Sequence, residues 1–151
     1  MAIEYQSIGQ FRTKLHPRSG APRQGALHPE NSGIIELDDR YAGTLEGLEK
    51  SEYIIVLYHL HLSGNWHTTV RPPGSTRSFG LFATRSPNRP NPIGFSVVKL
   101  NRIKGNALYV SGVDAFDGTP VLDIKPFLPS IDCPEEYRNS GMTGLEKEVG
   151  L

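Results

Sequence analysis

The sequence has one cysteine and no long apolar run, and each shortage excludes a class of protein. Cys133 has no second cysteine to form an internal disulfide with, which favours a reducing compartment. The densest apolar run covers residues 53–58, whereas a transmembrane helix needs roughly 20 apolar residues. The N-terminus has neither the basic start nor the apolar core of a signal peptide. We therefore expect a cytoplasmic protein without a membrane anchor.

Acidic residues are missing from the middle of the chain, although the formal net charge is zero. Residues 53–113 contain no Asp or Glu, and the acids lie toward the two ends. Such asymmetry can form a basic face suited to phosphates or RNA, although the same side chains scattered over the surface would only be solvated. The charge count leaves both readings open. The basic residues of this stretch are Arg71, Arg77, Arg85, Arg89, Lys99, Arg102 and Lys104.

Turn residues are abundant in this chain of 151 residues, which contains 16 Gly and 12 Pro. The length suits one domain, and the composition favours short strands joined by loops. We expect an all-β, compact β-barrel of six or seven strands with long functional loops and little helix, over residues 1–129. A short helix or helical turn is predicted over residues 41–49, and residues 130–151 form a polar tail, loose or docked. The expected strands are residues 3–8, 33–37, 53–60, 79–84, 95–103, 107–113 and 121–124.

A proline-rich segment, residues 85–94, is the first candidate for a functional loop. Its three prolines between positions 87 and 92 restrict the backbone and remove amide donors. Arg85, Arg89 and Asn91 would project from this stiff loop, and such side chains recognise phosphate, carboxylate or base edges. An ordinary surface turn is the alternative, because Pro and Asn are common turn residues.

Two further loops carry polar side chains next to glycines. The first contains Pro22, Arg23 and Gln24 before Gly25, and this glycine would permit close approach of another backbone. The second contains Asp114, Asp117 and Asp123, any of which could accept a proton if burial raised its pKa. The alternatives are that Asp117 caps its own turn with Gly118 and that Asp123 pairs with Lys125 or an arginine.

No metal site is expected. His59 and His61 share one face at the end of a predicted strand, yet no third ligand follows at a zinc-binding spacing. Histidines that line a pocket are the simpler interpretation. The sequence also contains no phosphate-loop motif, Rossmann glycine fingerprint or nucleophile elbow.

Two long motifs make the chain resemble a known family. Residues 82–94 read FATRSPNRPNPIG, and residues 114–126 read DAFDGTPVLDIKP. Shorter matches precede them at residues 22–24, 45–49 and 70–73, and at Trp66, and they also occur in the order typical of the family. Over about residues 8–129 the chain resembles the TsaA-like, or TrmO, family.

The resemblance implies a β-barrel that binds S-adenosylmethionine and acts as a homodimer. It also implies methylation of the N6 nitrogen of N6-threonylcarbamoyladenosine, beside the anticodon of a threonine tRNA. The alternative is an S-adenosylmethionine-binding regulatory module without catalysis. Longer bacterial members have an additional C-terminal domain, so the barrel or its dimer partner would grip the RNA here. The positions expected to bind the cofactor are Pro22, Arg23, Gln24, His59, Leu60, Arg85, Phe95, Val113, Asp114, Ala115 and Phe116.

The methyl transfer suggests roles for individual side chains. Asp114 and Asp117 are candidates for the base that removes a proton from N6. Arg89 and Lys125 could contact RNA or stabilise developing negative charge, and Asn91 could orient the target base. For the cofactor, we expect apolar packing against Phe95 and Phe116 with backbone groups near Val113, and Arg23 and Arg85 at its carboxylate.

Overall fold

The computed structural model describes residues 1–138 and 143–149. The chain divides into two compact units. The first contains Met1–His61 and Ile93–Phe127, and the second contains Leu62–Pro92 and Leu128–Leu151. Within the described ranges, no helix has both the length and the apolar character needed to cross a membrane.

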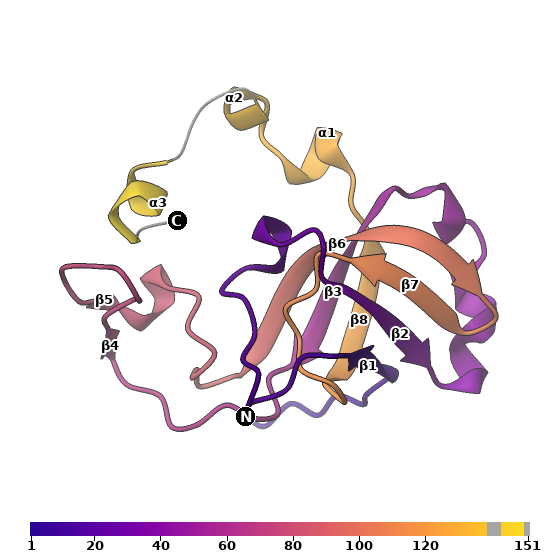
Figure 1. Ribbon diagram of the computed structural model, residues 1–151, viewed down its shortest axis with the longest axis horizontal. Coiled ribbons are helices and arrows are strands. Elements are labelled where there is room, and N and C mark those ends of the chain that lie inside the picture. The colour runs from indigo at the N-terminus through magenta and orange to yellow at the C-terminus, as the bar shows by residue number, and fades with distance from the viewer. Residues whose placement is uncertain (139–142, 150–151) are drawn as a thin grey trace. The chain divides into compact units, whose positions relative to one another are not determined.

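Six antiparallel strands close the first unit into a barrel, in the order β1-β2-β7-β6-β3-β8 (Figure 1). Helix is confined to short segments, so the all-β barrel predicted from the sequence is confirmed. The strands are β1 (Gly9–Thr13), β2 (Ser32–Leu37), β3 (Tyr53–His59), β6 (Ile93–Lys104), β7 (Ala107–Ser111) and β8 (Pro120–Pro126).

Alternation of side chains along the strands fills the barrel. Successive residues of a strand point to opposite faces, and in β3 the buried residues are Ile54, Val56 and Tyr58. β6 continues the same pattern with Ser96 and Val98 on its buried face. The other fully enclosed apolar side chains are Phe11, Ile35, Leu108, Val110, Val113 and Val121.

β6 is the longest strand and belongs to two pairings. Its first half pairs with β3 and its second half with β7, and the β6–β7 hairpin turns at Gly105, which has a φ of 61°. The hairpin was predicted over nearly the same residues. Register shifts at Leu57/Tyr58 and between Leu100 and Arg102 bend the strands, as bulges do in closed sheets.

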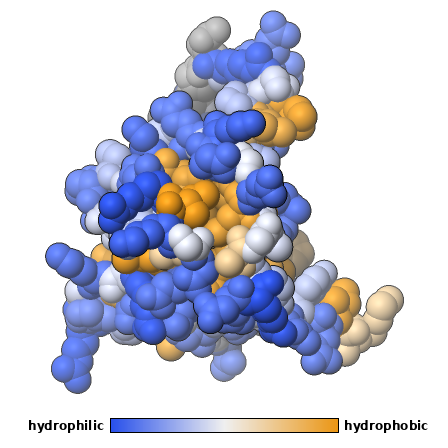
Figure 2. Space-filling model, turned by 90° about the vertical axis from the view of Figure 1, so that its right-hand side faces the viewer, coloured by the Kyte–Doolittle hydropathy of each residue, from blue (hydrophilic) through white to orange (hydrophobic). Residues whose placement is uncertain are grey.

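The barrel end at the β6–β7 turn is covered by apolar side chains. Two 3₁₀ helices, η2 (Asp39–Leu45) and η3 (Leu48–Lys50), lie where the sequence predicted a short helix. Gly47 separates them with a φ of 88°, in the left-handed region that favours glycine. Leu48 and Ile103 pack against the core, and Figure 2 shows apolar side chains gathered on this side with hydrophilic ones around them.

Two strand predictions were wrong. Residues 3–8 were expected to form the first strand, but Ile3 is 70% and Tyr5 74% exposed, and β1 begins at Gly9. Pairing decides this outcome, since β1 aligns with β2 from Gly9↔Leu37 to Thr13↔Gly33 and encloses Phe11. The strand expected over residues 79–84 ends at Gly80.

The second unit holds short elements. β4 (Thr69–Val70) pairs with β5 (Phe79–Gly80), and the 3₁₀ helix η4 (Leu81–Ala83) follows. Three short helices occupy the described part of the tail, and residues 139–142 and 150–151 of the predicted tail lie outside the described residues. Arg77 forms an ion pair with Glu148 of the last helix. These helices are α1 (Pro129–Asp132), α2 (Glu135–Arg138) and α3 (Gly144–Val149).

Candidate functional site

Two long loops meet at the barrel end opposite the β6–β7 turn. The first runs from the end of β1 to the start of β2 and contains the 3₁₀ helix η1 (Gly25–Leu27); the second connects β7 to β8. Their backbones are joined, because Gly112 N donates to Asn31 O at 2.7 Å and Asp117 N to Leu15 O at 2.8 Å. The end of β3 and the start of β6 lie at the same end, where His59 pairs with Ile93.

Asp114 is the centre of the hydrogen bonding at this end. Its Oδ1 accepts from Ser96 Oγ at 2.8 Å and from Tyr58 Oη at 3.0 Å. Its Oδ2 accepts from the Gly25 amide at 2.9 Å. The two hydroxyls also lie 2.9 Å apart, so three close contacts share two hydroxyl protons. The carboxylate thus links β3, β6 and the two loops; we refer to Gly25, Tyr58, Ser96 and Asp114 as the Asp114 cluster.

The Tyr58 ring is held by its neighbours inside the barrel. Phe11 meets it edge-on, with ring centroids 5.5 Å apart and an interplanar angle of 85°. The ring also lies so close to β6 that a Cβ added to Gly94 would stand 2.1 Å from Tyr58 Cε2. The hydroxyl group is therefore brought to Asp114 by a ring that packs against both Phe11 and Gly94.

Gly25 provides the close backbone approach that the sequence predicted. A Cβ at this position would lie 2.1 Å from the carbonyl oxygen of Gly112, so no larger residue fits without a shift of the backbone. Gly112 itself has a φ of 81°. This contact places Pro22, Arg23 and Gln24 directly before a residue that is fixed to the second loop.

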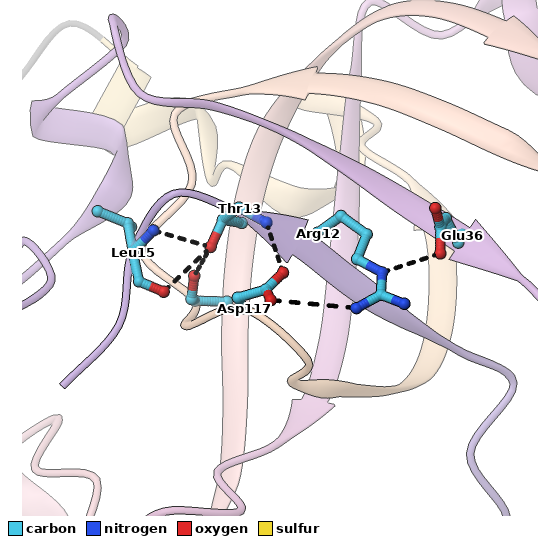
Figure 3. A network of polar contacts seen from close by, with 6 residues as sticks. Arg12, Thr13, Leu15, Glu36 and Asp117 are labelled. Carbon is cyan, nitrogen blue, oxygen red and sulfur yellow. Dashed lines mark hydrogen bonds and ion pairs between the residues drawn. The ribbon is translucent and has the colours of Figure 1, made fainter.

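Asp117 joins the second loop to β1 (Figure 3). Its Oδ1 accepts from the Thr13 amide at 3.1 Å, and its Oδ2 lies 4.0 Å from Arg12 Nη1, whose Nε binds Glu36 Oε2 at 3.0 Å. The Thr13 hydroxyl donates to the carbonyl oxygen of Ala115 at 2.9 Å. The carboxylate therefore acts across two segments, and not on its own turn as the simplest reading of the sequence suggested.

The remaining barrel residues of the predicted site differ in exposure. Val113 and Ala115 are buried, Phe116 is half-buried, and 48% of Phe95 is exposed beside Leu57 of β3. His59, the last residue of β3, is exposed, and Leu60 packs against the core. Among the described residues, no three His, Cys, Asp or Glu side chains lie close enough to hold a metal ion.

Lys125 and Asp123 form an ion pair on β8, with Nζ and Oδ2 2.8 Å apart. Of the alternatives left open by the sequence, the structure shows the one in which Asp123 pairs with Lys125. The hydrogen bond that Lys125 donates to Asp123, and then the charge of that carboxylate, raise the pKa of the Lys125 ammonium group above its usual value. The shift favours the charged form, which an exposed lysine already has at neutral pH.

In the second unit, the proline-rich loop is irregular as predicted, but Arg89 does not project from it. Its Nη1 donates to the carbonyl oxygens of Thr84 at 2.9 Å and Ser86 at 3.3 Å, and its guanidinium lies 5.6 Å from the centre of the Phe82 ring. Arg89 thereby closes the loop on itself. Arg85 and Asn91 are exposed.

The sequence interpretation missed Tyr58 and Ser96. Both lie at alternating positions of apolar strands, where they resemble ordinary core residues. Their only sequence signal is a polar oxygen on a buried face, which requires a partner. A surface depression of about 670 Å³ also escaped notice; it is lined in part by Gln10, Glu36 and Asn106 and by none of the predicted site residues.

The closed barrel of six antiparallel strands, with a hydrogen-bonded cluster between two loops at one end, defines the class of this protein as a small β-barrel. Residues 10–133 match the family model of the tRNA-methyltransferase O N-terminal domain. The chain belongs to this family, which confirms the resemblance recognised in its motifs.

Relatives and solved structures agree with this membership. The chain is 43% identical over 126 residues to an S-adenosyl-L-methionine-binding protein of Archaeoglobus fulgidus, covering 83% of this chain and 90% of that one. It is 36% identical over 137 residues to the tRNA (adenine(37)-N6)-methyltransferase of Mus musculus, covering 86% of this chain and 32% of the relative. A crystal structure of TrmO matches with a TM-score of 0.77 and 38% identity, covering 92% of this chain and 64% of that one. The chain thus spans about a third of the mouse relative and less than two thirds of the solved TrmO chain.

Proposed function

We propose that the protein is an S-adenosylmethionine-dependent methyltransferase that acts on the N6 nitrogen of a tRNA adenosine. Family membership supports this activity, together with a relative named tRNA (adenine(37)-N6)-methyltransferase. The structural observation that carries the proposal is the Asp114 cluster, because it joins the barrel segments whose residues were expected to hold the cofactor. A cytoplasmic location, where tRNA is available, belongs to the same proposal.

The residues at this barrel end suit the chemistry of the cofactor. S-adenosylmethionine presents an apolar adenine face, hydrogen-bonding groups on its ribose, and a carboxylate. Phe95 leaves apolar surface uncovered and Phe116 is half-buried, so both can pack against adenine. Arg23 and Gln24 precede a fixed glycine and can donate to polar groups. In the second unit, Arg85 is exposed on a proline-stiffened loop and is the second candidate for the carboxylate.

The proposed chemistry assigns tasks to the protein's own side chains. When bound, S-adenosylmethionine supplies an electrophilic methyl group on sulfur. Transfer replaces a proton on N6 with this methyl group and leaves a neutral thioether, so the protein must orient N6 and accept its proton. Asp117 is the better candidate for the proton acceptor, because its Oδ2 lies 4.0 Å from Arg12, beyond hydrogen-bond distance. Asp114 already accepts from three donors.

We propose N6-threonylcarbamoyladenosine of a threonine tRNA as the substrate. The resemblance in the two long motifs supports this assignment. The absence of Asp and Glu from residues 53–113, which carry seven basic residues, favours contact with RNA phosphates. Lys125 keeps its positive charge beside Asp123 and is a candidate for contact with the RNA, and Asn91 could orient the target base.

The test is incubation with methyl-labelled S-adenosylmethionine and two tRNA samples, one with and one without the threonylcarbamoyl group. Nucleoside mass analysis should find a methylated threonylcarbamoyladenosine in the first sample alone. Label in unmodified adenosine would support methyltransferase activity and contradict the proposed substrate. Cofactor binding without label in either RNA would contradict catalysis and favour a regulatory S-adenosylmethionine-binding module.

We also propose that the active protein is a homodimer, as the family resemblance implies. Light scattering after size-exclusion chromatography should give about twice the mass of the 151-residue chain. A monomer that retains full methyl transfer would contradict this part of the proposal.

A further inference from the structure

Each barrel segment expected to contact the cofactor borders one member of the Asp114 cluster. The members are brought together from distant parts of the sequence, since Gly25 is 89 residues from Asp114 and Tyr58 is 56 residues from it. The neighbours are Gln24 beside Gly25, His59 beside Tyr58, Phe95 beside Ser96, and Val113 and Ala115 beside Asp114. Asp114 lies in one of these four segments, and its carboxylate forms hydrogen bonds to a residue next to each of the other three.

The cluster differs in chemistry from the interior around it. Tyr58 and Ser96 are buried, and most of the buried core is apolar, including Phe11, Val98 and Val121. Thr119 is the other buried polar residue of the described chain, and it lies outside the cluster. Apolar side chains would fill this volume without a carboxylate. Directional hydrogen bonds to a partly buried carboxylate hold their partners more rigidly than apolar contacts do, because apolar contacts tolerate small displacements.

We propose that Asp114, Tyr58 and Ser96 are positioning residues that hold the four cofactor-binding segments in register, and that Asp114 is not the proton acceptor. The Tyr58 and Ser96 hydroxyls fix one carboxylate oxygen relative to β3 and β6. The second oxygen then fixes the Gly25 amide and with it the loop that carries Arg23 and Gln24. This inference rests on the proposed function, because it assigns the four segments to S-adenosylmethionine.

The role predicts a particular kinetic pattern. Loosened segments bind the cofactor less well both before and during the reaction, so the KM for S-adenosylmethionine rises while kcat at saturation changes little. Loss of a proton acceptor would instead lower kcat. A residue needed for folding alone would change the amount of folded protein and leave both constants of the folded fraction intact.

The experiment compares Tyr58→Phe, Ser96→Ala and the double variant with the wild-type protein. Each single variant removes one hydroxyl and keeps the remaining side chain. Ser111→Ala is the matched control, since it removes a strand hydroxyl that accepts a hydrogen bond of 2.7 Å from Asn101 Nδ2 outside the cluster. Calorimetry measures affinity for S-adenosylmethionine, thermal unfolding measures stability, and the NMR signal of the Gly25 amide reports its bond to Asp114.

We expect the double variant to bind S-adenosylmethionine about 10-fold more weakly, which corresponds to the loss of one or two net hydrogen bonds. The Gly25 amide signal should shift in the double variant and stay in place in Ser111→Ala. Equal affinity in the folded double variant and the wild type would overturn the positioning role, as would an equal loss in the control. If Asp114→Asn lowered kcat at saturation with an unchanged KM, Asp114 would be the proton acceptor after all.

Failure of this inference is separable from failure of the proposed function. A wild-type protein that binds no S-adenosylmethionine would overturn both. A wild-type protein that binds the cofactor and methylates tRNA, with variants of equal affinity, would overturn only the positioning role.

Discussion

Gly94 and Tyr58 lie in contact across the β3–β6 pairing, where a Cβ on the glycine would stand 2.1 Å from the tyrosine ring. The closeness of the two strands at this point lets the tyrosine hydroxyl reach Asp114. Gly94, in the first long motif of the chain, therefore makes room for the tyrosine that binds Asp114 in the second long motif.

Gly94→Ala should destabilise the protein by about 1–3 kcal/mol, because the added methyl group must displace the buried Tyr58 ring. Urea unfolding of the purified variant measures the change. The control is Gly43→Ala in η2, where the added Cβ would meet nothing within 4 Å and the free energy of unfolding should hardly change. Equal stability of the two variants would mean that the Tyr58 ring can shift away from β6 at little cost in free energy.

Asp117→Asn should separate structure from chemistry. The asparagine carbonyl can still accept from the Thr13 amide, so the free energy of unfolding should fall by less than about 1 kcal/mol. If Asp117 accepts the N6 proton, methyl transfer should fall by roughly 100-fold or more. Glu36→Gln removes the other acidic partner of Arg12 and is the control, with activity expected to be unchanged. Full activity in Asp117→Asn would exclude this carboxylate as the base.

Arg89→Ala should loosen the proline-rich loop, because Arg89 binds two carbonyl oxygens of that loop. Arg85 precedes a serine and is open to trypsin, whereas Arg71 and Arg89 precede prolines and resist cleavage. We expect trypsin to cut after Arg85 several-fold faster in the variant, as measured by mass spectrometry of timed digests. In the control variant Arg102→Ala, which removes a side chain lying over Tyr109 of the barrel, trypsin should cut after Arg85 at the wild-type rate.

Acid should weaken the start of α3. The Thr143 amide donates to Glu146, and the Thr143 hydroxyl accepts from the Glu146 amide, which is a capping box. The hydrogen bond from the Thr143 backbone is the largest cause that lowers the pKa of Glu146 from 4.5. A lowered folded-state pKa contributes stability above pH 4.5 that is lost as the pH falls through the folded value.

An NMR titration of the Glu146 carboxyl carbon should therefore give a midpoint below 4.5. The helical shifts of α3 should weaken over the same pH range. Glu146→Gln should remove that pH dependence, and a midpoint at the ordinary value would contradict the capping box.

Local patterns were sufficient to predict most of the barrel. The strand over residues 53–60 follows from a continuous run of branched and aromatic side chains, and the hairpin around Gly105 follows from a glycine at the turn. The first strand could not be located in this way. Ile3 and Tyr5 alternate as well as any strand, whereas β1 contains one large apolar residue, Phe11, and depends on its pairing with β2.

The candidate site was predictable where the sequence concentrates unusual residues in loops. The close backbone approach at Gly25 was predicted from residue type, and the Asp123–Lys125 pair was one of the alternatives that the sequence left open. Tyr58 and Ser96 were not, because their role depends on closure of the barrel, which brings β3 and β6 to the loop after β7. Arg89 was expected to face a ligand. Its position in the sequence does not reveal that the carbonyl oxygens of Thr84 and Ser86 lie within hydrogen-bond distance of its guanidinium group.

Closure of the barrel also constrains the order in which the chain can fold. β8 lies between β1 and β3, and yet it is the last barrel strand along the chain. Until a ribosome has released residues 120–126, both of these neighbours have an unpaired edge, and the loop carrying Gly25 has no completed barrel to rest on. Such non-local pairing slows folding. A growing chain therefore completes its barrel, on which the loop carrying Gly25 lies, only after its final strand has been synthesised.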